Sequence, residues 1–92
     1  MKSNYNKNYE RLELIEEMEK EFNNKNIHFF SKLSVHHDPV IRTRAICIIA
    51  ELGGENAVET ISKALKEDLD ELVRHEAAFS LGQLGFTSAI KP

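Results

Sequence analysis

Two neighbouring residues, His75 and Glu76, carry the side chains best suited to metal chemistry in this chain. An imidazole and a carboxylate together suit non-haem iron(II). A stable centre usually needs at least about three protein ligands, so we expect iron here only in a site completed by other repeats or another chain. The alternative is structural: both are polar residues early in a helix, where Glu76 lies favourably near the positive end of the dipole.

A second cluster, His36-His37-Asp38, is a weaker metal candidate, with His28 nearby in the sequence. Asp38 has a simpler role, because an aspartate followed by proline is typical of the first residues of a helix. The histidines precede this helix in a connection, where side chains are usually exposed. We therefore favour a helix cap over a metal site.

The remaining residues offer no further catalytic group. There is no glycine-rich phosphate loop, no serine or cysteine nucleophile in a recognisable setting, and no Cys/His spacing for zinc. Cys47 stands alone in the apolar run Ala45–Ala50, which predicts an inert core thiol and no internal disulfide. We assign no catalytic residue and expect no covalent catalysis by this chain alone.

The chain repeats itself at an interval of 32 residues, the distance from Asp38 to Asp70. The identical pairs include Leu33/Leu65, Asp38/Asp70, Arg42/Arg74, Ala45/Ala77, Leu52/Leu84, Gly53/Gly85 and Ala57/Ala89. A constant interval of this size marks stacked repeats. We predict one domain, 1–92, with repeats over about residues 5–37, 38–69 and 70–92, of which the first is diverged and the last incomplete.

Apolar residues recur with the period of an amphipathic helix, and no segment shows sustained strand alternation. We therefore predict an all-α fold. The first expected helix ends at Asn23-Asn24. Three more run over about residues 26–35, 38–52 and 55–66. The last starts at Asp68 or Asp70 and ends at Gly85. The expected inward residues include Tyr5, Tyr9, Leu12, Ile15, Met18 and Phe22 in the first helix, Ala57, Val58, Ile61, Ala64 and Leu65 in the fourth, and Leu72, Val73, Ala77, Leu81 and Leu84 in the last.

The C-terminal edge is predicted to lack a cover. Residues 86–92 align with only the first turn of the paired helix, whereas terminal repeats normally have a polar outer face. We expect the side that carries Leu81 and Leu84 to be covered by another copy of the chain or by further sequence. This predicts a homo-oligomer that forms through the C-terminal edge.

The pattern Asp-x-x-(Val/Ile)-Arg-x-x-Ala, then Leu-Gly, then an Ala-led helix resembles HEAT-like repeats of the phycobilisome lyase type. The resemblance implies an α-α superhelix of about two and a half hairpins. It also suggests a structural ladder in which Arg42 and Arg74 reach neighbouring helix caps.

Within that class, the segments 42–45, 52–54, 57, 61–64 and 72–84 are similar to the N-terminal repeats of the deoxyhypusine hydroxylases. That resemblance implies an iron-dependent monooxygenase, in which four His-Glu dipeptides from two opposed repeat halves hold two irons. His75-Glu76 is the one such dipeptide here, and Thr43-Arg44 stands one repeat earlier. The implied site is incomplete in this chain.

Composition limits the remaining possibilities. Ninety-two residues with 41% apolar and 29% charged side chains make one small soluble domain with little room for a deep cavity. A net charge of -3 disfavours nucleic acid as a partner, which needs a basic face. The longest apolar run, Ala45–Ala50, is far below the roughly 20 residues of a membrane span, and residues 1–9 lack the apolar stretch of a signal peptide.

These observations favour a cytoplasmic protein-interaction module that associates with itself and is not catalytic alone. The alternative is a fragment or subunit of an iron-dependent hydroxylase that resembles deoxyhypusine hydroxylase.

Overall fold

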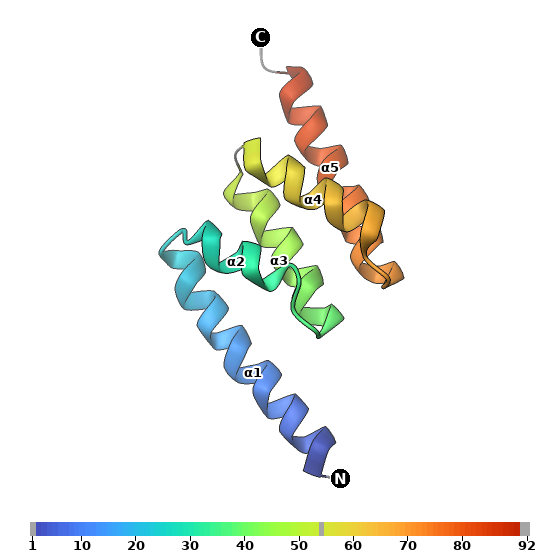
Figure 1. Cartoon of the computed structure of the whole chain (residues 1–92). Coiled ribbons are helices and arrows are strands. Elements are labelled where there is room, and N and C mark those ends of the chain that lie inside the picture. The colour runs from blue at the N-terminus through green and yellow to red at the C-terminus, as the bar shows by residue number, and fades with distance from the viewer. Residues whose placement is uncertain (1, 54, 91–92) are drawn as a thin grey trace.

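The computed structural model describes residues 2–53 and 55–90, with side chains described for residues 9–53 and 57–85. The helices are α1 (Lys2–Asn23), α2 (Ile27–Leu33), α3 (Pro39–Leu52), α4 (Glu55–Glu67) and α5 (Glu71–Ile90), as Figure 1 shows. The described residues contain no strand. The predicted all-α fold is confirmed.

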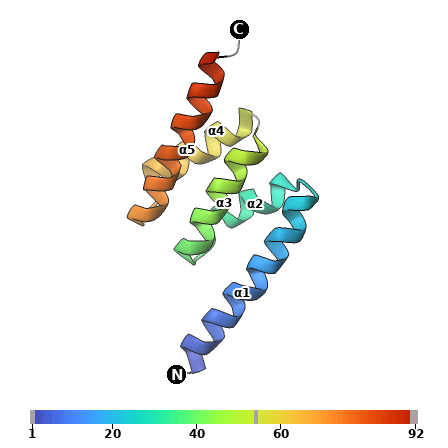
Figure 2. The same cartoon turned by 180° about the vertical axis from the view of Figure 1, so that it is seen from behind.

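The helices form two layers of an elongated molecule that measures 54 × 29 × 15 Å. Helices α1, α3 and α5 run in the same direction along one layer, and α2 and α4 cross the other face of it (Figures 1 and 2). Helix α3 contacts all four of the other helices. This alternation of stacked helices is the predicted α-α superhelix. None of the described helices is both long and apolar enough to cross a lipid bilayer.

Local sequence explains where the central helices begin and end. The Asp38 carboxylate accepts a hydrogen bond of 2.9 Å from the backbone N–H of Val40, and Pro39 occupies the first helical position of α3. Gly53 ends α3 with a φ of 80°, a conformation that residues with a Cβ rarely adopt. The side chain of Asn26 caps α2 by accepting from the N–H of Phe29. The predicted cap at Asp38 is confirmed. Gly53 has the predicted positive φ, but its ψ of −167° differs from the expected left-handed helical turn.

The core runs through the middle of the stack. Its buried apolar residues are Met18, Phe30, Leu33, Ile41, Ala45, Ile46, Ile49, Ala57, Ile61, Val73 and Ala77. Ala45 and Ala77 occupy matching places in the repeat, and both are fully buried. Helix α3 contributes four core residues and α1 contributes Met18 alone, so α3 is the element around which its neighbours pack.

Two arginine–aspartate pairs tie successive layers together. The Nε and Nη2 atoms of Arg11 donate to the Asp38 carboxylate at 2.8 and 3.1 Å. In the same way, Nε and Nη2 of Arg42 donate to Asp68 at 2.9 and 3.0 Å. Each guanidinium therefore holds a loop about one repeat further along the chain in a bidentate geometry. The expected contact of Arg42 with the next layer is present, but its acceptor is Asp68 and not the cap residue Asp70. Arg74, also expected to reach a cap, donates to the backbone carbonyl oxygen of Asp68 instead.

The last helix does not end where we expected. Helix α5 continues through Gly85 to Ile90, so residues 86–90 extend it instead of starting a paired helix. Among the described glycines, Gly53 has a positive φ and Gly85 does not. A glycine within a helix costs only about 1 kcal/mol relative to alanine, which the other residues of a long helix readily offset.

Several residues that we expected to face inward are exposed. Val58 and Leu72 have 45% and 54% of their surface exposed, and Tyr9 and Leu12 have 57% and 62%. Tyr9 and Leu12 lie on α1 before the segment that packs on the core, in which Leu14, Ile15, Met18 and Phe22 are buried or partly buried. The expectation for Cys47 was also wrong, since its side chain is exposed. The expectations for Tyr5 and Gly54 lie outside the described side chains.

Candidate functional site

The His75-Glu76 dipeptide lies one turn into α5. This helix starts where the Asp70 carboxylate accepts from the N–H of Leu72 at 2.8 Å, and Asp68 in turn accepts from the N–H of Asp70 at 2.9 Å. The two residues lie on different sides of α5: His75 is exposed, whereas Glu76 is half-buried.

Glu76 lines a hollow of about 260 Å³ between α3 and α5. Its carboxylate accepts a hydrogen bond of 3.2 Å from the hydroxyl of Ser80, a residue that is only 3% exposed. The other residues that line the hollow are Cys47, Ala50, Glu51, Phe79, Gln83 and Leu84. The hollow is therefore partly acidic and partly apolar.

The thiol of Cys47 is held in its protonated form in this hollow. Partial burial raises its pKa most, the charges of Glu76 and Glu51 raise it further, and Arg44 opposes them. Because the thiolate is the nucleophilic form, Cys47 is a poor nucleophile despite its exposure. The sequence placed Cys47 in the core, whereas it lies at the edge of this hollow, where partial burial and two acidic neighbours together raise its pKa.

His75 and Glu76 do not make a complete metal centre by themselves. No group of three His, Cys, Asp or Glu side chains that could hold a metal occurs among the described residues. The matching residues one repeat earlier supply no ligand of the His-Glu type: Thr43 donates its hydroxyl to the Pro39 carbonyl at 2.8 Å, and Arg44 is exposed. Further ligands would have to come from outside the described residues or from another chain, so iron binding at His75 and Glu76 stays a prediction.

The second histidine cluster has a structural role. His36 Nδ1 accepts a hydrogen bond of 3.0 Å from the N–H of Asp38, which requires that this nitrogen carry no proton. Burial lowers the pKa of His36 most, the charges of His37 and Arg42 lower it further, and Asp38 and Glu10 oppose them. The rings of His36 and His37 stack at 4.2 Å. His36 thus does for α3 what Asp68 does for α5, because each accepts the N–H of the helix-capping aspartate two residues later.

One side of α5 is largely exposed, although Phe79 on this side also lines the hollow between α3 and α5. This outward face of α5 consists of Leu72, His75, Ala78, Phe79 and Gly82, which are all exposed. Leu72 and Phe79 expose more than half of their surface. The position that matches Ala78 in α3 is Ile46, which is fully buried. An apolar position that the stack buries in α3 is therefore open in α5.

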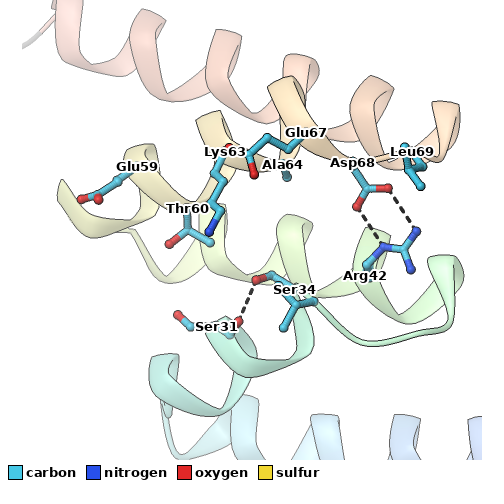
Figure 3. Close-up of a pocket in the computed structure, with 11 residues that line it drawn as sticks. Ser31, Ser34, Arg42, Glu59, Thr60, Lys63, Ala64, Glu67, Asp68 and Leu69 are labelled. Carbon is cyan, nitrogen blue, oxygen red and sulfur yellow. Dashed lines mark hydrogen bonds and ion pairs between the residues drawn. The ribbon is translucent and has the colours of Figure 1, made fainter.

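A groove of about 610 Å³ separates α2 and α4 on the opposite face of the molecule (Figure 3). Lys63 and Thr60 extend from α4 into the groove opposite Ser31 and Ser34, and the Arg42–Asp68 ion pair closes one end (Figure 3). The remaining lining residues are Val35, Glu59, Ala64, Glu67 and Leu69. This mixed polar lining offers no cluster of three metal ligands among the described residues, and the groove was not predicted from the sequence.

The ladder residues Arg11 and Asp68 were missed by the sequence interpretation. Arg11 lies 31 residues before Arg42, close to the repeat interval, and this spacing was the available signal. Asp68 and Asp70 both precede α5, and spacing alone did not distinguish the cap from the acceptor of Arg42.

Comparison with known proteins agrees with the architecture. The family model described as HEAT repeats matches residues 8–92. Deoxyhypusine hydroxylase of Dictyostelium discoideum is 41% identical over 51 residues, which are 55% of this chain and 16% of that protein. Deoxyhypusine hydroxylase of Drosophila pseudoobscura pseudoobscura is 38% identical over 50 residues, which are 54% of this chain and 16% of that protein. The similarity thus spans less than a fifth of the length of these relatives. No solved structure gives a significant match.

Proposed function

Because the chain belongs to the HEAT repeat family, we propose that it is a protein-interaction module that associates with itself through the C-terminal edge and is not catalytic on its own. HEAT repeats stack so that each layer covers the apolar side of the one before it, and a partner can take the place of a missing layer. The lone cysteine, which favours a reducing compartment, supports a cytoplasmic location within this proposal.

The observation that carries this proposal is the outward face of α5. Leu72 and Phe79 are 54% and 58% exposed, and they lie two turns apart on the same side of the helix. Aromatic and aliphatic side chains grouped in this way are typical of an interface core. Self-association would remove both residues from water.

The test is the molar mass in solution, measured by size-exclusion chromatography with light scattering over a range of concentrations. The wild-type chain is expected to exceed its monomer mass of 10.5 kDa increasingly as concentration rises. A Leu72→Ser/Phe79→Ser variant should stay at the monomer mass, and its far-UV spectrum should match that of the wild type because both positions are exposed.

Val35→Ser is the matched control, because Val35 is 76% exposed but precedes α3, away from the outward face of α5. It should associate as the wild type does. A wild-type chain that remains a monomer at every concentration would refute self-association.

A second candidate function is a part of an iron-dependent hydroxylase. The similarity to deoxyhypusine hydroxylase over about half of this chain favours it. In such a site His75 and Glu76 would be two of the ligands, and bound iron would supply oxygen activation. Because the described residues offer no cluster of three ligands, this function requires ligands from another chain or another repeat.

The experiment for this candidate is anaerobic loading with ferrous iron, followed by gel filtration and metal analysis. Retention of about one iron per site that is lost in a His75→Ala/Glu76→Ala variant would support it. His37→Ala replaces another exposed histidine and should leave the iron content unchanged. If the wild-type chain retains no iron, these residues do not form a site in this chain.

A further inference from the structure

The connection between α2 and α3 meets α1 at a hollow of about 220 Å³. Glu10, Arg11 and Leu14 line this hollow from α1, and His36 lines it from the connection. His36 is half-buried there, and burial is the largest cause of its lowered pKa. Because α1 forms one wall of the hollow, the burial of His36 and the docking of α1 are coupled.

Helix α1 is joined to the stack by few side chains. It packs beside α3 at one edge of its layer (Figure 2). Among the described side chains of α1, Met18 is the one that belongs to the buried core, and Leu14 and Phe22 pack against that core in part. The ion pair from Arg11 to Asp38 adds a charged contact. Release of α1 thus opens far less of the core than unfolding of the whole domain does.

A neutral His36 leaves the Asp38 carboxylate free to hold α1. The Nδ1 atom of His36 accepts the N–H of Asp38 at 3.0 Å, and a ring nitrogen that accepts carries no proton. The carboxylate accepts from Nε and Nη2 of Arg11 at 2.8 and 3.1 Å and from the N–H of Val40 at 2.9 Å. Asp38 therefore uses its N–H to fix His36 and its side chain to hold α1.

A proton on His36 is incompatible with this arrangement. Both ring nitrogens of an imidazolium are donors, so Nδ1–H would face the N–H of Asp38 and the ring has to turn away from it. The turned imidazolium is a cation beside Asp38 and competes with Arg11 for the same carboxylate. Protonation of His36 thus weakens the charged contact that holds α1.

The other charges around His36 come from the connection, from α3 and from α1. His37 in the connection and Arg42 of α3 disfavour a proton on His36, and both remain when α1 leaves. Glu10 of α1 favours the proton, so its departure opposes the effect. The loss of burial outweighs it, and the departure of Arg11 leaves an unpaired carboxylate beside the ring. The released state therefore binds the proton more tightly than the docked state.

We propose that His36 is a pH-dependent latch for α1: the neutral ring keeps α1 docked, and a proton on the ring releases α1 while α2 to α5 stay folded. Linkage sets the size of the effect. If the released state has the usual histidine pKa of about 6.5 and the docked state binds no proton, the docking equilibrium falls about tenfold between about pH 7.5 and 5.5. This latch does not depend on the self-association proposed above.

Hydrogen–deuterium exchange of the dilute chain, followed by mass spectrometry, measures the release. Protection factors correct for the pH dependence of intrinsic exchange, and peptides of α3 report unfolding of the whole domain. In the wild type, the ratio of α1 to α3 protection should fall by up to about tenfold from about pH 7.5 to 5.5. His36→Asn keeps an acceptor for the Asp38 N–H but does not titrate, so its ratio should stay nearly constant. His28→Asn replaces an exposed histidine of α2 and should behave as the wild type does.

Two further variants test the parts of the latch. Arg11→Gln removes the cation that holds Asp38, so the protection of α1 should be low already at about pH 7.5 and fall less on acidification. His37→Asn should retain the fall, and a fall that disappears there but persists in His36→Asn would assign the effect to the wrong ring. A wild-type ratio that is the same at both pH values would overturn the latch. An equal loss of protection in α3 would show unfolding of the whole domain and would overturn it as well.

Discussion

Replacing Arg42 by glutamine removes the better buried of the two arginine–aspartate pairs. The side chains of Arg42 and Asp68 are 16% and 8% exposed, whereas those of Arg11 and Asp38 are 40% and 15% exposed. The guanidinium of Arg42 also donates to the carbonyl oxygens of His36 and His37. Loss of Arg42 thus leaves a nearly buried carboxylate and two backbone carbonyls without their cation.

The expected loss follows from this burial. Breaking a buried ion pair by removing one partner costs about 3–5 kcal/mol. Asp68 keeps the N–H of Asp70, so we expect the free energy of unfolding to fall by about 2–4 kcal/mol in Arg42→Gln. For a domain of this size that lowers the melting temperature by roughly 10–25 °C. Arg11→Gln makes the same chemical change at a solvent-screened site and should have a much smaller effect.

Urea titrations followed by circular dichroism at 222 nm measure both variants. Burial raises the pKa of Asp68, but the Arg42 hydrogen bonds, the Asp70 N–H and the charges of Arg42 and Arg74 outweigh it and hold that pKa below its usual value. Stability from this pair is therefore present above the usual aspartate pKa and lost as the pH falls through the lowered one. The difference in the free energy of unfolding between the wild type and Arg42→Gln should therefore become smaller at acidic pH. Equal losses for Arg42→Gln and Arg11→Gln at neutral pH would refute this reasoning.

Three further predictions concern single side chains. The pKa of His36 is lowered in the folded state, so its contribution to stability should be complete above pH 6.5, the usual histidine pKa, and should be lost as the pH falls through the lowered pKa. His36→Asn keeps an acceptor for the Asp38 N–H but does not titrate, so urea titrations between pH 7.5 and 5 should show a weaker pH dependence of the free energy of unfolding. Glu76→Gln should speed alkylation of Cys47 by iodoacetamide at pH 8, because it removes a charge that raises the thiol pKa; an unchanged rate would contradict the electrostatic account. Gly53→Ala should lower the free energy of unfolding by about 1 kcal/mol, because residues with a Cβ rarely adopt a positive φ. An added Cβ would meet no atom within 4 Å, so this backbone strain is the whole expected cost. No loss in thermal melts would show that the turn rearranges.

The sequence predicted the features that depend on nearby residues. Asp38-Pro39 and Gly53 determine the two ends of α3 through a side-chain cap and a glycine with positive φ, and neither requires knowledge of the rest of the fold. The predicted all-α architecture followed from the helical period and from the interval between Asp38 and Asp70.

The errors concern features that depend on distant neighbours. The helical period groups Tyr9 and Leu12 with Met18, but it cannot say that only the later part of α1 has a partner to pack on. Gly85 resembles Gly53 in sequence, yet α5 continues through it, because a glycine permits a turn without requiring one.

In the candidate sites, too, the sequence predicted what depends on nearby residues and missed what depends on distant ones. The sequence located the His75-Glu76 dipeptide, but its side chains lie on different sides of α5, which only the packing of that helix reveals. The ladder acceptor Asp68 depends on how loops of successive layers meet in space. The predicted repeat boundaries at about residues 37 and 69 stay a prediction.

Small-angle X-ray scattering over a concentration series tests most directly whether the outward face of α5 is covered by another copy. At high dilution the radius of gyration should approach that of the single chain, 13.9 Å over its Cα atoms. As concentration rises, it should increase together with the longest dimension of the particle, and Leu72→Ser/Phe79→Ser should remove that increase. Scattering curves that superpose at all concentrations, with a radius of gyration near the single-chain value, would contradict the account.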